Sequence, residues 1–128
     1  MLGLESLSGL RVVADPDALD GATWTGGPIT VVRIAPDEAF AIGATEVEIG
    51  DSNAIVEPEP GFSGASLDSA NLESVLAHVE FALPTERPAL VQGKVAGVPA
   101  KLLLGDGDDA TLLVVQTAYA HDLETRLR

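Results

Sequence analysis

The chain has no cysteine and few basic or aromatic residues, and each shortage excludes a class of structure or function. Without cysteine there is no disulfide scaffold, thiolate metal site or cysteine nucleophile. Seven Lys and Arg residues stand against twenty Asp and Glu residues, and the net charge of −13 argues against nucleic acid or an anionic membrane surface as a partner. Because aromatic residues make up only 4%, a stacking platform for bases or sugars is not expected.

Long hydrophobic runs are also missing. The longest fully apolar stretches are of the length of Leu112–Val115, far short of the roughly 18–20 residues that cross a bilayer. The first residues include an early acidic residue and no basic cluster, unlike a signal peptide. We therefore expect a cytoplasmic chain with no membrane partner.

Hydrophobic residues are plentiful, at 46% of 128 residues, which is enough for the core of one ordinary domain. Residues 1–27 are rich in Gly, Asp, Ser and Thr and contain one short apolar patch. This composition predicts an irregular N-terminal arm over 1–27. Residues 28–128 are expected to form a single α+β domain.

Short β-branched or alternating segments predict strands within that domain. Pro36-Asp37 joins the first two of these segments, which indicates an antiparallel hairpin. The last segment is apolar throughout, as expected of a central strand covered on both faces. The six predicted strands are 28–35, 38–43, 45–49, 89–96, 98–104 and 111–116.

Two segments have the apolar spacing of amphipathic helices. The first covers about 68–79, with its leading aspartate as the N-cap. The second covers about 117–127, and its predicted apolar stripe is Tyr119, Leu123 and Leu127. The order of strands, helix, strands, helix favours a two-layer α+β fold with a mostly antiparallel sheet and two main helices.

Groups that could carry chemistry are sparse. His78 and His121, the two histidines, fall on predicted helix surfaces without clustered ligands or a nucleophile. The acidic segment Gly105–Asp109 fails the ligand spacing of a calcium loop, and we interpret it as a hairpin turn. We predict no catalytic, cofactor-binding or metal-binding residues.

Glu57 and Glu59 lie between prolines, in a segment predicted to be an extended, exposed loop. A carboxylate pair performs acid–base chemistry when burial separates the two pKa values, which an exposed loop does not provide. A rigid loop is instead suited to contacting another protein. We therefore predict Glu57 and Glu59, together with Phe62 and Trp24, as candidate partner contacts.

The second half of the chain carries a recognisable pattern: a Gln followed by a strand pair of Gly-Val-Pro type, an apolar strand, and a helix that opens with Tyr-Ala. The matching segments are Ala89–Leu104, Leu112–Val115 and Ala118–Leu123. On these segments, and on Ile34–Gly43 and Leu72–Val79 upstream, the chain resembles the sarcosine oxidase gamma subunit family.

The resemblance implies a fold like part of the folate-binding domain of aminomethyltransferases. It implies a non-catalytic accessory subunit of a heteromeric flavoenzyme that oxidatively demethylates N-methyl amino acids such as sarcosine. The chain would bind no cofactor itself, and flavin, NAD and folate would be held by larger flavoprotein subunits. The alternative is a stand-alone acidic protein-interaction domain that self-associates and has no link to amine oxidation.

Overall fold

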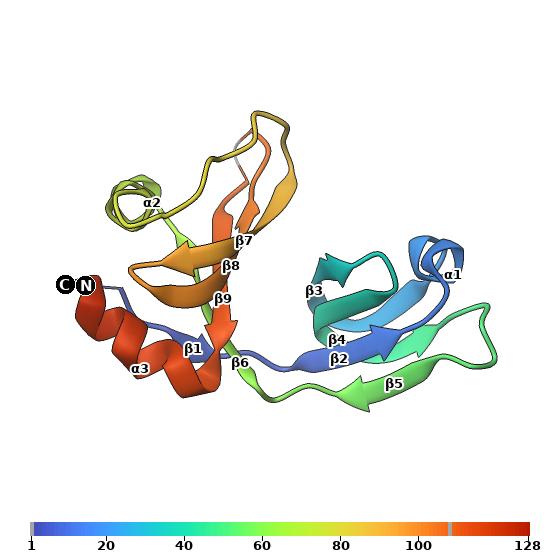
Figure 1. Ribbon diagram of the computed structural model, residues 1–128. Coiled ribbons are helices and arrows are strands. Elements are labelled where there is room, and N and C mark those ends of the chain that lie inside the picture. The colour runs from blue at the N-terminus through green and yellow to red at the C-terminus, as the bar shows by residue number, and fades with distance from the viewer. Residues whose placement is uncertain (1, 108) are drawn as a thin grey trace. The chain divides into compact units, whose positions relative to one another are not determined.

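The computed structural model describes residues 2–107 and 109–128, which contain nine strands and three helices (Figure 1). The strands form two sheets, of five and four strands, and every pairing within them is antiparallel. The α+β class predicted from the sequence is therefore confirmed, although with two sheets in place of one.

The chain divides into two compact units, whereas the sequence analysis expects an arm and a single domain. Unit 1 comprises Met1–Ser6 and Gly61–Arg128, and unit 2 comprises Leu7–Pro60. Strands β1 (Glu5–Ser6) and β6 (Phe62–Leu67), which flank unit 2 in the sequence, pair with each other in the sheet of unit 1. Unit 2 is thus an insertion between two paired strands, a relationship that no local sequence signal carries.

The sheet of unit 1 has the strand order β1-β6-β9-β8-β7. Its three C-terminal strands, β7 (Ala89–Val95), β8 (Val98–Leu104) and β9 (Thr111–Gln116), match three predicted strands. The apolar strand β9 lies in the centre, between β6 and β8, as predicted. Leu113 and Val115 of β9 are buried because helices cover the face of the sheet from which they project.

Helices α2 (Ser69–Leu76) and α3 (Thr117–Arg126) pack on one face of this sheet. The predicted N-cap is confirmed, because Asp68 Oδ1 accepts a hydrogen bond of 2.8 Å from the Asn71 N–H. The core between helices and sheet is aliphatic, and its buried residues are Leu67, Val75, Val95, Val98, Ala100, Leu102, Leu104, Leu113, Val115, Ala120 and Leu123.

Helix α2 ends earlier than the predicted position 79. Val79 forms a β-bridge with Val95, and the Ala96 N–H donates to the His78 carbonyl at 2.8 Å. The last predicted helical residues therefore extend the edge of the sheet, because β7 offers them hydrogen-bond partners that a single helical turn does not.

The apolar stripe of α3 also differs from the prediction. Tyr119 is 39% exposed, whereas Ala120 and Leu123 are buried and Leu127 is half-buried. Successive helix positions are about 100° apart. The face of α3 that packs on the sheet is therefore rotated by about one position from the predicted stripe, so that Ala120 is buried and Tyr119 is not.

The turn between β7 and β8 is tightly held. Its central residues, Ala96 and Gly97, have φ of +50° and +80°, the signature of a two-residue hairpin turn of type I′. The Gly97 N–H donates to Glu80 Oε2 at 2.7 Å, and Arg126 Nη1 donates to the Ala96 carbonyl at 2.8 Å. Arg126 also pairs with Asp122 at 3.2 Å, so α3 fixes the turn through one guanidinium group.

Unit 2 is a four-stranded sheet in the order β3-β4-β2-β5. Its strands are β2 (Gly9–Val13), β3 (Thr23–Ala35), β4 (Glu38–Glu48) and β5 (Ile55–Pro58). The predicted hairpin is confirmed, because β3 and β4 pair antiparallel across the Pro36-Asp37 turn. The predicted strands at 38–43 and 45–49 are one continuous strand, β4.

The irregular arm predicted over residues 1–27 is not observed in the described residues. Strand β2 lies between β4 and β5 with Val12 completely buried, and helix α1 (Pro16–Asp20) follows it. The β2 sequence is short and becomes a strand only by pairing with distant segments. Helix α1 does carry a local signal that the analysis missed, since Asp15 caps it and proline occupies its first position.

The Gly26-Gly27-Pro28 segment does not end an arm but lies inside β3, where the register to β4 shifts. Across from it, Gly43 has φ of +87°, and a Cβ there would collide with the Pro28 carbonyl oxygen. A bulge of this kind needs glycine because the two backbones approach closely.

Val32 and Phe40 of unit 2 are completely buried. A separate buried cluster of this unit is rich in alanine. Its buried members are Leu10, Val12, Ala14, Leu19, Ala39, Ala41 and Ala44. In both units, none of the helices described is at once long and apolar enough to traverse a bilayer.

Candidate functional site

Glu57 lies in strand β5 and not in a loop, which corrects the prediction for this segment. β5 is an edge strand, where Pro58 is tolerated because its missing N–H would face away from the neighbouring strand. The Glu57 side chain is 61% exposed, with its Oε2 4.0 Å from Arg11 Nη1. Glu59 follows the strand, and its N–H donates to the Gly9 carbonyl at 2.9 Å.

Arg11 lies among the acidic side chains of this edge. Its Nε donates to Glu38 Oε2 at 2.8 Å. The pKa of the Arg11 guanidinium is raised, first by the hydrogen bond that it donates to Glu38 and then by the negative charges of Glu38, Glu57 and Glu59. The carboxylates thus surround a permanent cation at the surface, and this arrangement is a charge network and not an acid–base pair.

The two predicted aromatic contacts lie in different units. Trp24, in β3, is half-buried and packs against the core of unit 2. Phe62 begins β6 in unit 1, and Lys101 Nζ lies 5.5 Å from the centre of its ring, within the range of a cation–π contact. All four predicted partner contacts are at least partly accessible, and their role in binding remains a prediction.

The histidines lie apart from any cluster of catalytic groups. His78 Nδ1 is 3.0 Å from the Ser74 carbonyl, and His121 is exposed on α3. Asp108, within the predicted turn Gly105–Asp109, lies outside the described residues. Among the residues that the structure describes, no three His, Asp or Glu side chains gather to hold a metal ion.

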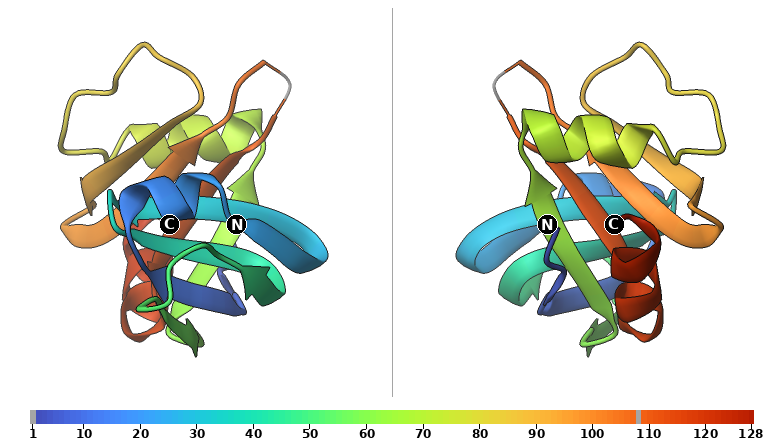
Figure 2. Two further views of the ribbon diagram at one scale, coloured as in Figure 1. Left: turned by 90° about the vertical axis from the view of Figure 1, so that its right-hand side faces the viewer. Right: turned by 90° about the vertical axis from the view of Figure 1, so that its left-hand side faces the viewer.

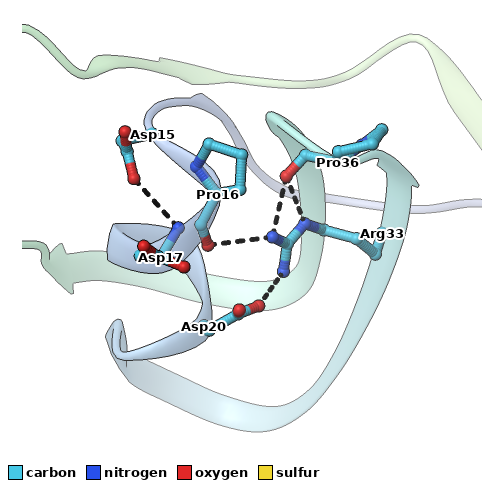
Figure 3. A network of polar contacts seen from close by, with 6 residues as sticks. All are labelled: Asp15, Pro16, Asp17, Asp20, Arg33 and Pro36. Atoms are coloured by element: carbon cyan, nitrogen blue, oxygen red, sulfur yellow. Dashed lines mark hydrogen bonds and ion pairs between the residues drawn. The ribbon is translucent and has the colours of Figure 1, made fainter.

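Arg33 organises the polar contacts of unit 2 (Figure 3). Its guanidinium donates to Asp20 Oδ1 at 2.9 Å, to the Pro16 carbonyl at 3.0 Å and twice to the Pro36 carbonyl, at 2.7 and 3.0 Å. The side chain therefore ties α1 to the β3–β4 turn. Because four contacts occupy its donors, we assign Arg33 a structural role.

A pocket of about 510 Å³ lies in unit 1, beside α2. Figure 2 shows α2 at the same end of the sheet as the loop before β7 and the connection between β8 and β9. We call this cavity of about 510 Å³ the α2 pocket. Among the described residues, its five leucines are Leu67, Leu72, Leu76, Leu83 and Leu104, and its charged residues are Asp68, Arg87 and Asp109. Its volume is within the usual range of binding sites.

The α2 pocket is not predictable from the sequence because its lining comes from three segments that are distant in the chain. Leu67–Leu76, Leu83–Arg87 and Leu104–Thr111 meet only after the sheet has formed. The excess of leucine on α2 is explained equally well by core packing, so no local pattern distinguishes the pocket.

Comparison with known proteins does not assign a family to this chain. No protein-family model matches the chain, and no curated protein matches it. The resemblance to the sarcosine oxidase gamma subunit family therefore remains a prediction from the sequence.

Proposed function

We propose that this chain is a non-catalytic, gamma-like accessory subunit of a heteromeric flavoenzyme of the sarcosine oxidase type. The enzyme would oxidatively demethylate N-methyl amino acids in the cytoplasm, and its larger subunits would hold flavin, NAD and folate. The chain would act by packing against those subunits.

The observation that carries the proposal is the way in which the resembling segments fold together. Ala89–Leu104 forms the β7–β8 hairpin, Leu112–Val115 belongs to β9, and Ala118–Leu123 belongs to α3. Hydrogen-bonded pairing joins the three strands, and α3 packs on them. The C-terminal segments of the resemblance thus form one continuous piece of unit 1, which supports its use as a guide to function, whereas Ile34–Gly43 lies in unit 2.

The charge of the chain also supports a role in protein association. A net charge of −13 favours a basic partner surface and raises the rate of encounter with it. The accessible residues Glu57, Glu59, Phe62 and Trp24 remain the predicted contacts.

Affinity capture of the tagged full-length chain from its own host tests this proposal. We expect recovery of a yellow complex with flavin absorbance and N-methyl amino acid oxidation, whereas the chain purified alone is colourless and inactive. A tagged protein of similar size and charge serves as the control. Failure to recover any flavoprotein, with the bait folded and abundant, would count against the proposal.

A self-associating acidic domain is the second candidate function. It is favoured by the β5 edge of unit 2, where Ile55 and Val56 are 51% and 43% exposed, because exposed edge strands can pair with a second chain. Light scattering of the purified chain distinguishes the two functions: a stable homo-oligomer favours self-association, and a monomer favours the accessory subunit.

A further inference from the structure

We propose that the α2 pocket is a docking site for a protein segment that presents leucine-like side chains flanked by Lys or Arg. The inference deepens the proposed function and rests on it, because it names the chemistry by which an accessory chain would hold its partner. Nothing in the predicted contacts or in the catalytic analysis above uses this pocket.

The floor of the α2 pocket selects an aliphatic occupant. Leu67 and Leu104 are almost fully buried beneath it, whereas Leu72, Leu76 and Leu83 are half-buried and keep apolar surface accessible. A volume of about 510 Å³ accommodates more than one aliphatic side chain. Covering these leucines removes apolar surface from water, which is the main favourable contribution to such docking.

The rim of the pocket selects the charge of the occupant. Among the described residues it carries two carboxylates, Asp68 and Asp109, and one guanidinium, Arg87. Arg87 Nη1 is held by its own loop, donating to the Pro84 carbonyl at 2.6 Å and the Glu86 carbonyl at 2.8 Å, and it keeps its positive charge. The two carboxylates exceed this charge, so the rim favours a cationic neighbour for the apolar side chains, and the net charge of −13 attracts the same kind of segment from a distance.

Three short peptides separate the apolar and ionic contributions to this binding. The probes are acetyl-Lys-Leu-Leu-Lys-amide, its counterpart with two alanines in place of the leucines, and its counterpart with two glutamates in place of the lysines. Each is titrated into the isotope-labelled full-length chain while amide correlation spectra are recorded. We expect saturable shifts at pocket residues such as Leu76, Gly105 and Thr111 with the first peptide.

The leucine–lysine peptide should bind at least about tenfold more tightly than either counterpart. Its affinity should fall as salt is added, because exposed charges are screened. Equal binding by the alanine peptide, tighter binding by the glutamate peptide, shifts spread over unit 2, or no saturable binding would each overturn the proposal.

Pocket variants locate the site with matched controls. Leu83→Asp places a charge on the apolar wall and should abolish binding, while amides of unit 1 away from the pocket, such as those of Val98 and Lys101, report whether this unit remains folded. Asp109→Asn should weaken binding about twofold to threefold, whereas Asp106→Asn, in the same loop but not lining the pocket, should leave it unchanged. Equal effects of the two Asp→Asn variants would overturn the role of the rim.

The pocket and the proposed function can fail separately. If the wild-type chain binds the peptide but captures no flavoprotein, the docking site stands and the accessory role is rejected. If it captures a flavoprotein that Leu83→Asp also captures in equal yield, the accessory role stands and the docking site is rejected.

Discussion

The two units of this chain have buried clusters that differ in the size of their side chains. In unit 1 two helices cover one face of the sheet, and large aliphatic residues such as Leu102, Leu113 and Leu123 fill the space between the helices and the sheet. In unit 2, Val32 and Phe40 are completely buried, but the buried cluster around β2 includes four alanines, and close backbone approaches and the Arg33 contacts connect its segments. Small side chains contribute less buried apolar area, so this alanine-rich cluster depends more on backbone pairing, and the core of unit 1 depends more on side-chain burial.

The two units also differ in their balance of acidic and basic residues. Unit 2 carries ten Asp and Glu residues against two arginines, whereas unit 1 carries ten acidic residues against five basic ones. The excess of like charge in unit 2 destabilises its compact state through repulsion. The comparison therefore leads us to expect that unit 2 opens more readily than unit 1.

The largest effect is expected from Leu102→Ala, which removes a fully buried side chain from unit 1. Truncation of a core leucine leaves a cavity and costs about 3–5 kcal/mol. Hydrogen exchange should show the loss of protection concentrated on the amides of unit 1. Equal loss in both units would show that they unfold as one and would break the comparison.

Gly43→Ala is expected to destabilise unit 2 by roughly 2–4 kcal/mol, because its positive φ and the nearby Pro28 carbonyl both resist a Cβ. Urea unfolding, with exchange of unit 2 amides, measures this loss. Gly50→Ala is the matched control, since a Cβ there meets no atom within 4 Å. Similar values for the two variants would remove the argument that close backbone approach supports unit 2.

Ala96→Asn should stabilise unit 1 by about 0.5–1 kcal/mol, because alanine is strained at a positive φ and the type I′ turn favours Asn-Gly. Thermal unfolding measures the gain. Ala89→Asn, in the strand of the same hairpin, should instead destabilise, since asparagine is disfavoured in strands. A loss at position 96 would contradict the assigned turn type.

The smallest effect is expected from Asp51→Asn in unit 2. The pKa of Asp51 is lowered because its carboxylate accepts hydrogen bonds from the backbone N–H groups of Asp15 and Asn53. This group stabilises the fold above its unfolded pKa, and the contribution is lost as the pH falls through the lowered folded pKa. Asp51→Asn should therefore reduce the acid-side slope of unit 2 stability.

Titration of unfolding free energy against pH measures that slope. Glu46→Gln, an exposed acidic position on β4, serves as the control for removing one charge. An unchanged slope in the Asp51 variant, or an equal change in the control, would show that the hydrogen-bonded carboxylate has no special role.

The C-terminal part of unit 1 was predictable because its signals are local, whereas β1 and β6 are not among the predicted strands. Within a few residues each, the sequence predicts α2 from the Asp68 cap, β7 and β8 from their alternating residues, and β9 from its apolar run. Unit 2 was predicted only in part. The β3–β4 hairpin has a local turn, whereas β2 depends on partners in β4 and β5 that lie far along the chain.

The candidate sites also differ in whether they depend on local sequence or on contacts between distant segments. The exposure of Glu57 was predictable from neighbouring prolines, although its place in an edge strand was not. The α2 pocket could not be predicted, because Leu67, Leu83 and Leu104 are brought together by the sheet and not by sequence spacing.

By itself the amino-acid sequence determined the α+β class, the Asp68 cap of α2 and the net charge of −13, because each depends on residue type and short-range spacing. Only the tertiary structure decided that Leu7–Pro60 is an insertion between paired strands and that leucines from three segments line one pocket. Both outcomes arise from long-range strand pairing, which depends on which distant backbones satisfy one another's hydrogen bonds.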